Sequence, residues 1–371
     1  MCTTESPLAG FVPQSWSLSD HERALIAAST RFAREQLEPL LSQAPSPSDW
    51  RSIVKHAAAL DLGTMILPAH LGGLSLSGHD LACIISALGT GPVERGAELT
   101  LSAPALMTLR DHDALGWHDA QIIGNYFDGT RSIALAVPDL DTSTLWCLSS
   151  STTRSDQTLT LIPHAAGLVL VQLTSPAHES RHEHLATLGA LWLEQRHYAD
   201  TLSVQPLATL EHLNADGPNP VQTWLTYNVL YLSALLTGAM QHDIEGALRY
   251  ASERHAFRKP LVMHQRVAIR LADMFVAARS NQLFLRAATL VEPSAPISLV
   301  RQLIRHVAIE SVDFTHELVQ LYGGHGYVEG LPPAARLRTC HWFAQLLMQI
   351  DTALGQLDAR LAFSRDAKVG S

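Results

Sequence analysis

Two short stretches of the chain hold residue types that can bind an anionic group. Arg254 lies in the first, and the adjacent Gly323 and Gly324 lie in the second. An arginine fork donates two parallel, charge-assisted hydrogen bonds to a diphosphate, and glycine lets a ligand approach the backbone closely because it has no Cβ. Each feature also has an ordinary explanation. An arginine near a helix C-terminus favours the helix dipole, and paired glycines form a common helix C-cap.

The sequence gives little support for a metal site or for a nicotinamide-binding site. The histidines at 178, 182, 184 and 197 lack the i,i+4 or paired-cysteine spacing of metal sites, so scattered surface histidines are the simpler interpretation. The four cysteines form no CxxC pair, which favours neither a zinc site nor a disulfide framework. No GxGxxG segment is present to indicate a Rossmann site. We therefore predict no metal ligands.

Changes in hydrophobic period divide the chain into three regions. Residues 1–128 read as helices with short breaks, and residues 129–215 carry short apolar runs between polar clusters, which is typical of a small β unit. Residues 216–371 return to a helical period over four long amphipathic segments. The pattern predicts a mainly α protein with a small β middle domain and a C-terminal four-helix bundle.

Composition limits the class of protein. The 371 residues include 26 basic and 35 acidic ones, so the net charge is 26 − 35 = −9, which excludes nucleic-acid binding by bulk electrostatics. Only 16% of residues are charged while 47% are hydrophobic, which indicates surface hidden in an oligomer. No run reaches the length of a membrane span. With no apolar leader, we expect a cytoplasmic protein.

Three stretches, in the expected order and spacing, resemble the flavin-dependent acyl-CoA dehydrogenases. Residues 62–76 hold a Gly, Pro and Gly-Gly turn, residues 250–261 read YASERHAFRKPL, and residues 320–327 read QLYGGHGY. The resemblance implies that family's fold, with an N-terminal helical domain, a middle β-barrel or sandwich and a C-terminal four-helix bundle. It also implies FAD as the cofactor.

In this family the middle domain of one protomer holds the isoalloxazine ring, and the bundle of its neighbour holds the ADP end of FAD. By position, Arg254 and Phe257 resemble the pair that meets the pyrophosphate and adenine region, and Gln265 is expected one turn into the next helix. Gln320, with Gly323 and Gly324, resembles the dinucleotide turn of the family. The resemblance thus implies six cofactor-binding residues: Arg254, Phe257, Gln265, Gln320, Gly323 and Gly324.

The catalytic base of the family is missing. A thioester α-proton is weakly acidic, so a base must lie within hydrogen-bond reach of it. The two positions that carry a carboxylate in the family correspond here to Leu347 and Asn228, and neither side chain can take a proton. Asp351, one helical turn beyond Leu347, is a weak alternative, and an ordinary surface or capping carboxylate is its simpler interpretation. We therefore predict no catalytic base in this chain.

The side of the site that would hold the flavin ring is also degenerate. Where the family has Thr-Glu-Pro, this chain reads Ala136-Val137-Pro138, and its β unit is short. On the other side, Arg258 replaces the glycine of the family's Phe-Gly-Lys-Pro. The half-site for a neighbour's ADP moiety is thus intact, while the half-site for the ring is eroded.

This asymmetry leads to the hypothesis of a subunit of a heteromeric α2β2 acyl-CoA dehydrogenase. Such members act on bulky CoA thioesters in bacterial steroid breakdown, so the resemblance implies a steroid-derived or similarly large acyl-CoA, a homologous partner that carries the catalytic Glu, and an electron-transferring flavoprotein as acceptor. This chain alone would be inactive. Two alternatives stay open: a self-sufficient homo-oligomer that uses Asp351 or another displaced carboxylate, and a non-enzymatic acyl-CoA-binding or scaffold relative.

Overall fold

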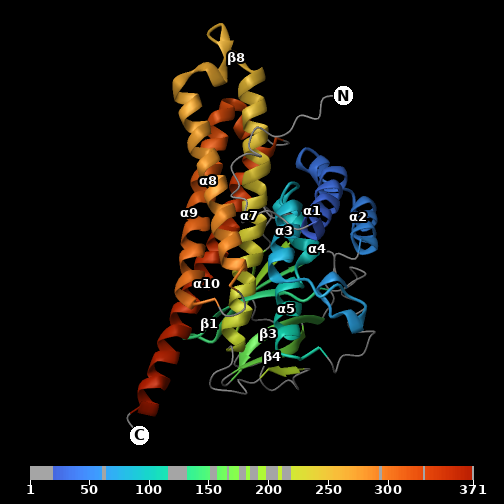
Figure 1. The fold of residues 1–371 in the computed structure, drawn as a ribbon. Helices are drawn as coiled ribbons and strands as arrows, with labels where there is room; N and C mark the ends of the chain where they lie inside the picture. Colours follow the sequence, from blue (N-terminus) through green and yellow to red (C-terminus); the bar gives the residue numbers. More distant parts are fainter. Residues whose placement is uncertain are drawn as a thin grey trace.

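A long helical bundle forms one side of the molecule, and a smaller helical region and two short sheets pack along it (Figure 1). The computed structural model describes residues 20–60, 64–115, 132–150, 157–164, 167–174, 181–183, 191–197, 208–210, 219–291, 295–328 and 331–369. The mainly α fold class with a small β part is confirmed. Both predicted domain boundaries, near 128 and 215, lie outside the described residues and stay predictions.

The N-terminal region is built from short helices with strong start signals. Ser46 and Ser77 each form a capping box with the aspartate three residues later, which satisfies free N–H groups at the start of α2 and α3. The described helices of this region are α1 (Asp20–Phe32), α2 (Pro47–Ala59), α3 (Gly78–Leu88), α4 (Val93–Thr100) and α5 (Ala103–Asp111).

The middle region forms two small antiparallel sheets. One has the strand order β1-β2-β6-β5 and the other β3-β4-β7. A parallel bridge from Ile133 to Leu159 links the two sheets at β3. The strands are β1 (Leu135–Asp139), β2 (Thr144–Ser150), β3 (Gln157–His164), β4 (Gly167–Thr174), β5 (Arg181–Glu183), β6 (Leu191–His197) and β7 (Ala208–Leu210).

The four long helices of the bundle follow the predicted segments. Asn219 caps the first by accepting hydrogen bonds from two backbone N–H groups, and Pro220 fills its first turn, where no N–H is needed. Between the first two helices lies a small hairpin, β8 (His255–Ala256) and β9 (Lys259–Pro260). The helices are α7 (Pro220–Glu253), α8 (Gln265–Thr289), α9 (Ile297–Tyr322) and α10 (Pro332–Val369).

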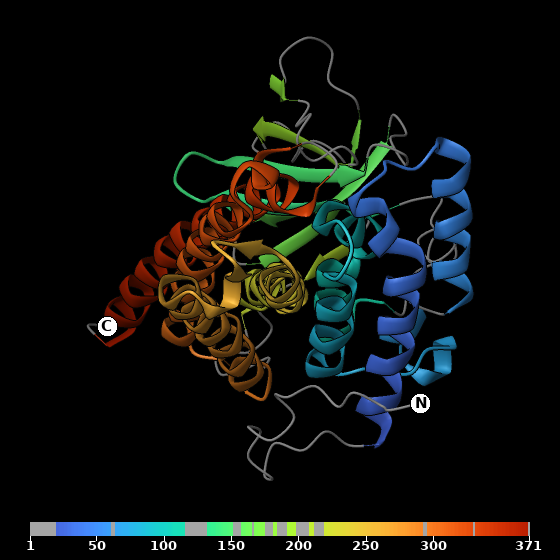
Figure 2. The same ribbon diagram turned by 90° about the horizontal axis from the view of Figure 1, so that it is seen from above.

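Helix α7 joins the bundle to the N-terminal region. Viewed from above, it lies between α3 and the rest of the bundle (Figure 2). The two backbones touch: a Cβ at Gly89 would lie 2.6 Å from the carbonyl oxygen of Leu235, and one at Gly238 would overlap the carbonyl oxygen of Ser86. Glycine is required at both positions because no side chain fits.

A buried ion pair reinforces the same joint. Nε of Arg336 on α10 lies 3.0 Å from a carboxylate oxygen of Asp243 on α7. The other guanidinium nitrogens of Arg336 donate to the carbonyl oxygens of Gly91 and Thr90, at 2.6 and 2.9 Å. Because both charges are paired and hydrogen-bonded, the network fixes α7, α10 and the turn between α3 and α4 relative to one another.

Within the described part of the chain, we find no helix that combines the length and the apolar character needed to cross a bilayer.

Candidate functional site

The β8–β9 hairpin presents an aromatic side chain at one end of the bundle. Ala256 pairs with Lys259, so Phe257 and Arg258 form a two-residue loop. Both have positive φ, 52° and 68°, which is the backbone of a type I′ turn. This geometry explains why the family places glycine at the position of Arg258. The side chain of Phe257 is 92% exposed.

Two further predicted residues flank this hairpin. Arg254 is the C-cap of α7, and its backbone N–H donates to the carbonyl oxygen of Tyr250. Its guanidinium is exposed and makes no hydrogen bond within the described residues, so its fork is available to an anion. Gln265 is exposed and is the first residue of α8, so the expectation that it lies one turn into this helix was wrong.

The glycine turn after α9 contains three glycines with different structural requirements. Gly323 has φ +57° and caps α9, as the ordinary explanation predicts. A Cβ at Gly326 would overlap the carbonyl oxygen of Val319, so packing requires glycine there. Gly324 has neither constraint, because its φ is not positive and a Cβ would meet no atom within 4 Å. Nothing within the described chain requires glycine at 324, which leaves an open backbone surface.

The structure brings the two motifs together at the same end of the bundle. The rings of Tyr250 and Tyr322 stack with centroids 4.1 Å apart, and Nε2 of Gln320 donates to the hydroxyl of Tyr327 at 2.9 Å. Burial, with the nearby Asp243, raises the pKa of Tyr322 to about 12, so this phenol stays neutral. We call the six predicted cofactor residues and these tyrosines the bundle tip.

The tyrosines of the bundle tip are functional candidates that the sequence did not single out. Tyr250 and Tyr322 lie inside the two motifs, and Tyr327 ends the second one. Their position in the motifs was the available signal, but only the fold shows that the first two stack on each other.

The bundle tip lies at the opposite end of α7 from the sheets that should hold a flavin ring (Figure 1). Asn228, which contacts β1, and Arg254 are separated by 26 residues of helix, or about 39 Å along the axis. An extended dinucleotide does not span that distance. The bundle tip and the chain's own β1 strand therefore cannot belong to one FAD site.

Strand β1 packs directly on the bundle at the position where the resemblance places the ring. Nδ2 of Asn228 donates to the carbonyl oxygen of Ala136 at 2.9 Å, and both residues are fully buried. At the other end of the strand, Gln356 on α10 accepts from the backbone N–H of Leu140 and donates to Asp139, both at 2.9 Å. Polar groups of β1 that face the bundle are thus already bonded within the chain.

Neither position of the family's base can move a proton. Leu347 is fully buried in the core of the bundle. Asn228 is an amide whose Nδ2 is committed to Ala136, and its Oδ1 has no partner among the described residues.

Asp351 is held in an ion pair and is not the surface or capping carboxylate that the sequence favoured. The residue is only 7% exposed, and its carboxylate accepts from Nε of Arg301 at 2.7 Å and from a guanidinium nitrogen of Arg305 at 3.2 Å. Burial alone raises the pKa of Asp351, but the hydrogen bonds from the two arginines outweigh it and lower the pKa below its usual value. A general base for a weakly acidic carbon needs the opposite shift.

The arrangement can therefore bind an anion but offers no general base at the expected positions. Arg254 supplies a free cationic fork, Gly324 an open backbone surface and Phe257 an exposed ring. No group of three or more His, Cys, Asp or Glu side chains within the described ranges is arranged to hold a metal ion.

Comparison with known proteins links the bundle to one family. Residues 216–349 match the family model for the acyl-CoA dehydrogenase C-terminal domain. The rat mitochondrial short-chain specific acyl-CoA dehydrogenase is 35% identical over 97 residues, which is 26% of this chain and 24% of that protein. An acyl-CoA dehydrogenase of Bacillus subtilis is 28% identical over 138 residues, 36% of each chain. The matches thus span about a quarter to a third of these relatives.

Solved structures extend the likeness to nearly the whole chain. Butyryl-CoA dehydrogenase from Megasphaera elsdenii superposes with a TM-score of 0.69 at 13% identity, covering 91% of this chain and 98% of that one. PigA with FAD and proline gives 0.70 at 17% identity, covering 93% and 99%. A glutaryl-CoA dehydrogenase in complex with glutaryl-CoA gives 0.71 at 16%, covering 94% and 98%. At these identities the likeness establishes the acyl-CoA dehydrogenase fold.

Proposed function

We propose that this chain, which has the acyl-CoA dehydrogenase fold and that family's C-terminal domain, is one subunit of a heteromeric flavin-dependent acyl-CoA dehydrogenase. It contributes the contacts to the ADP moiety of an FAD whose ring lies in a partner subunit. The partner supplies the catalytic base and the acyl-CoA cleft. A large, steroid-derived acyl-CoA is the proposed substrate, and an electron-transferring flavoprotein is the proposed electron acceptor.

The observation that carries this proposal is the contrast along α7. The bundle tip is exposed and has an unpaired arginine and an unconstrained glycine, while β1 is fastened to α7 and α10. A chain that built a whole FAD site from its own residues would need β1 to be open to the flavin ring. A chain that completes its neighbour's FAD site needs only an exposed bundle tip.

The residues of the bundle tip fit the ADP end of FAD. The fork of Arg254 suits the pyrophosphate, the exposed Phe257 ring offers a face to the adenine, and Gly324 leaves its backbone open to close approach. Gln265, Gln320 and Gly323 complete the set. When bound, the flavin accepts the hydride that leaves the substrate's Cβ.

The two alternatives make different demands on this structure. A homo-oligomer that uses Asp351 would require this carboxylate to leave two arginines, and its lowered pKa opposes proton uptake at neutral pH. A scaffold without flavin would leave Arg254 without the anion that its exposed fork suits. Both alternatives are therefore outcomes of the test rather than further proposals.

The test is the flavin-to-chain ratio, measured from visible absorbance against protein concentration. We expect almost no flavin on this chain expressed alone. Co-expression with a homologous subunit that carries the catalytic Glu should give one flavin for each pair of unlike subunits. A ratio near one on the isolated chain would overturn the half-site proposal, and a complex without flavin would favour the scaffold.

A further inference from the structure

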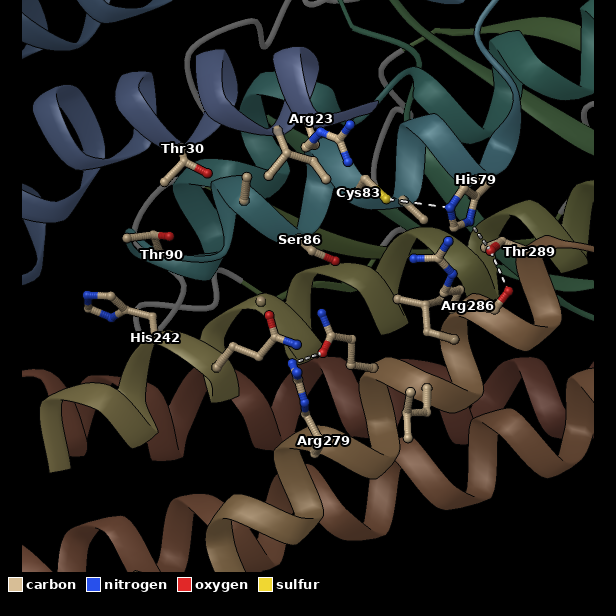
Figure 3. A pocket seen from close by; sticks show the side chains of 18 of the residues that line it. Arg23, Thr30, His79, Cys83, Ser86, Thr90, His242, Arg279, Arg286 and Thr289 are labelled. Carbon is tan, nitrogen blue, oxygen red and sulfur yellow. Dashed lines mark hydrogen bonds between the residues drawn. The ribbon is translucent and has the colours of Figure 1, made fainter. Parts of the chain in front are cut away.

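A cavity of about 540 Å³ lies between the N-terminal helices α1 and α3 and the bundle helices α7 and α8 (Figure 3). Its volume is within the range of sites for small organic ligands. Arg279, which lines it, is 14 residues along α8 from Gln265, or about 21 Å along the helix axis. None of the six proposed FAD-binding residues is among the described residues that line the cavity.

Arginines dominate the charge of this cavity. Arg23, Arg34, Arg279 and Arg286 line it, and Glu245 is the one acidic residue among the described residues of the lining. Arg23 also pairs with Asp20 outside the cavity. The described lining thus holds four arginines and one carboxylate, in a chain whose net charge is −9. Such a concentration of one sign selects for an anion.

The cavity also offers neutral hydrogen-bond donors. Nε2 of Gln241 is buried and has no partner within the described residues, although donors out of contact with water are normally paired. Arg279 donates to the neutral amide oxygen of Gln282, at 2.5 Å, and to no carboxylate in the part of the chain that the structure describes. Ser86 and Thr90 add hydroxyl groups to the wall. A ligand with several acceptor oxygens would satisfy these donors.

The rest of the lining is apolar. Ile26 on α1, Ala82 and Ala87 on α3, and Leu283 on α8 lie among the polar groups. A bare inorganic ion would leave these surfaces uncovered, whereas an organic body would cover them. The lining thus favours a molecule with an anionic head and a partly apolar body.

We propose that this cavity binds a small phosphorylated organic molecule. A phosphate brings about two negative charges at neutral pH and three acceptor oxygens, so one phosphate group can bind more than one of the four lining arginines. Arginine binds phosphate oxygens in bidentate geometry, and all the lining cations other than histidine are arginines. This inference does not depend on the proposed function.

Cys83 gives a local readout of binding. It lines the cavity and is partly exposed, with Sγ 3.9 Å from Nε2 of His79, whereas Cys147 and Cys340 are buried. Inorganic pyrophosphate and phenyl phosphate are the probes, added to the full chain during alkylation. We expect both to slow the labelling of Cys83, resolved by peptide mass spectrometry. Phenyl phosphate should protect at lower concentration than inorganic phosphate, which is added in a third reaction as the control without an organic body.

Substitutions of the lining arginines test whether these side chains bind the anion. Arg34→Gln and Arg279→Gln should each weaken pyrophosphate binding, measured by calorimetry, by about tenfold or more. Arg31→Gln, on the same helix as Arg23 but outside the described lining, should leave it unchanged. Absence of pyrophosphate binding, or equal losses in Arg31→Gln and Arg279→Gln, would overturn the proposal.

Discussion

The two ends of α7 carry two regions with opposite construction. At the bundle tip, arginine, phenylalanine and glycine are exposed, and the hairpin holds two residues with positive φ. At the β1 junction, meaning β1 with Asn228 and Gln356, the fully buried Asn228 donates to Ala136, and the partly buried Gln356 bonds both Leu140 and Asp139. The bundle tip therefore contributes little to folding, and the β1 junction stabilises the chain.

This difference separates function from stability. Substituting an exposed polar group that is not hydrogen-bonded within the chain changes the unfolding free energy little. Its loss should therefore weaken only the binding of a ligand or a partner. Buried, hydrogen-bonded groups are costly to change because the remaining partner stays unsatisfied. Substitutions in the two regions should thus produce separable effects on flavin content and unfolding free energy.

Arg254→Ala should have the largest effect on the proposed complex. Loss of two charge-assisted hydrogen bonds is expected to lower flavin affinity by at least about tenfold and to empty most sites during purification. The melting temperature of the isolated chain should not change. Arg249→Ala, an exposed arginine five residues earlier on α7, is the matched control and should keep its flavin. Full flavin content in the Arg254 variant would refute its role.

Asn228→Asp probes the β1 junction and the missing base together. A carboxylate there would face the carbonyl oxygen of Ala136 in a fully buried position, so we expect a loss of about 3 kcal/mol in unfolding free energy. Urea denaturation measures it. Asn219→Asp, at the N-cap of the same helix, should be neutral because both residues cap well. Flavin-dependent activity gained by Asn228→Asp in the isolated chain would contradict the closed junction.

Asp351→Asn distinguishes a structural carboxylate from a displaced base. Arg301 and Arg305 are partly exposed, which limits the expected loss to about 1–2 kcal/mol near pH 7. Because folding lowers the pKa of Asp351, its contribution is full above the unfolded pKa near 4 and disappears as pH falls through the folded pKa. The difference between wild type and variant should therefore shrink at acid pH.

The same variant has a kinetic readout. Turnover of the complex should be unchanged by Asp351→Asn if the partner supplies the base. Asp358→Asn, an exposed aspartate two turns further along α10, controls for the loss of a surface charge. Loss of turnover confined to the Asp351 variant would favour the homo-oligomer alternative.

The sequence predicted features that depend on neighbouring residues. Helical period indicated the four bundle helices, because the apolar spacing of a helix is a local property. The residues of the bundle tip could also be predicted from the sequence, because they lie in short motifs. Arg254 and Phe257 are three residues apart, and so are Gln320 and Gly323. The fold class was confirmed because it follows from the helical period, which is a local property.

Features that depend on residues far apart in the chain could not be predicted from the sequence. The Asn228 side chain meets an oxygen 92 residues away, and Asp351 meets arginines 50 and 46 residues earlier. The cavity arginines come from α1, from the helical segment Ala33–Leu37 that directly follows α1, and from α8. Arg34 and Arg279 are 279 − 34 = 245 residues apart in the sequence. No local pattern marks such pairs, so the sequence wrongly favoured a surface carboxylate at 351.

The smallest expected effect compares two glycines of one turn. Gly324→Ala should leave unfolding free energy within about 0.5 kcal/mol of wild type, because the new methyl group meets nothing in the chain. Its flavin affinity in the complex should fall severalfold, since the methyl group occupies the surface proposed for close approach. Gly326→Ala should instead cost about 1–3 kcal/mol by overlap with Val319. If Gly324→Ala keeps full flavin affinity, the open backbone at 324 serves no ligand, and the proposed role of the bundle tip rests on its other five predicted cofactor residues.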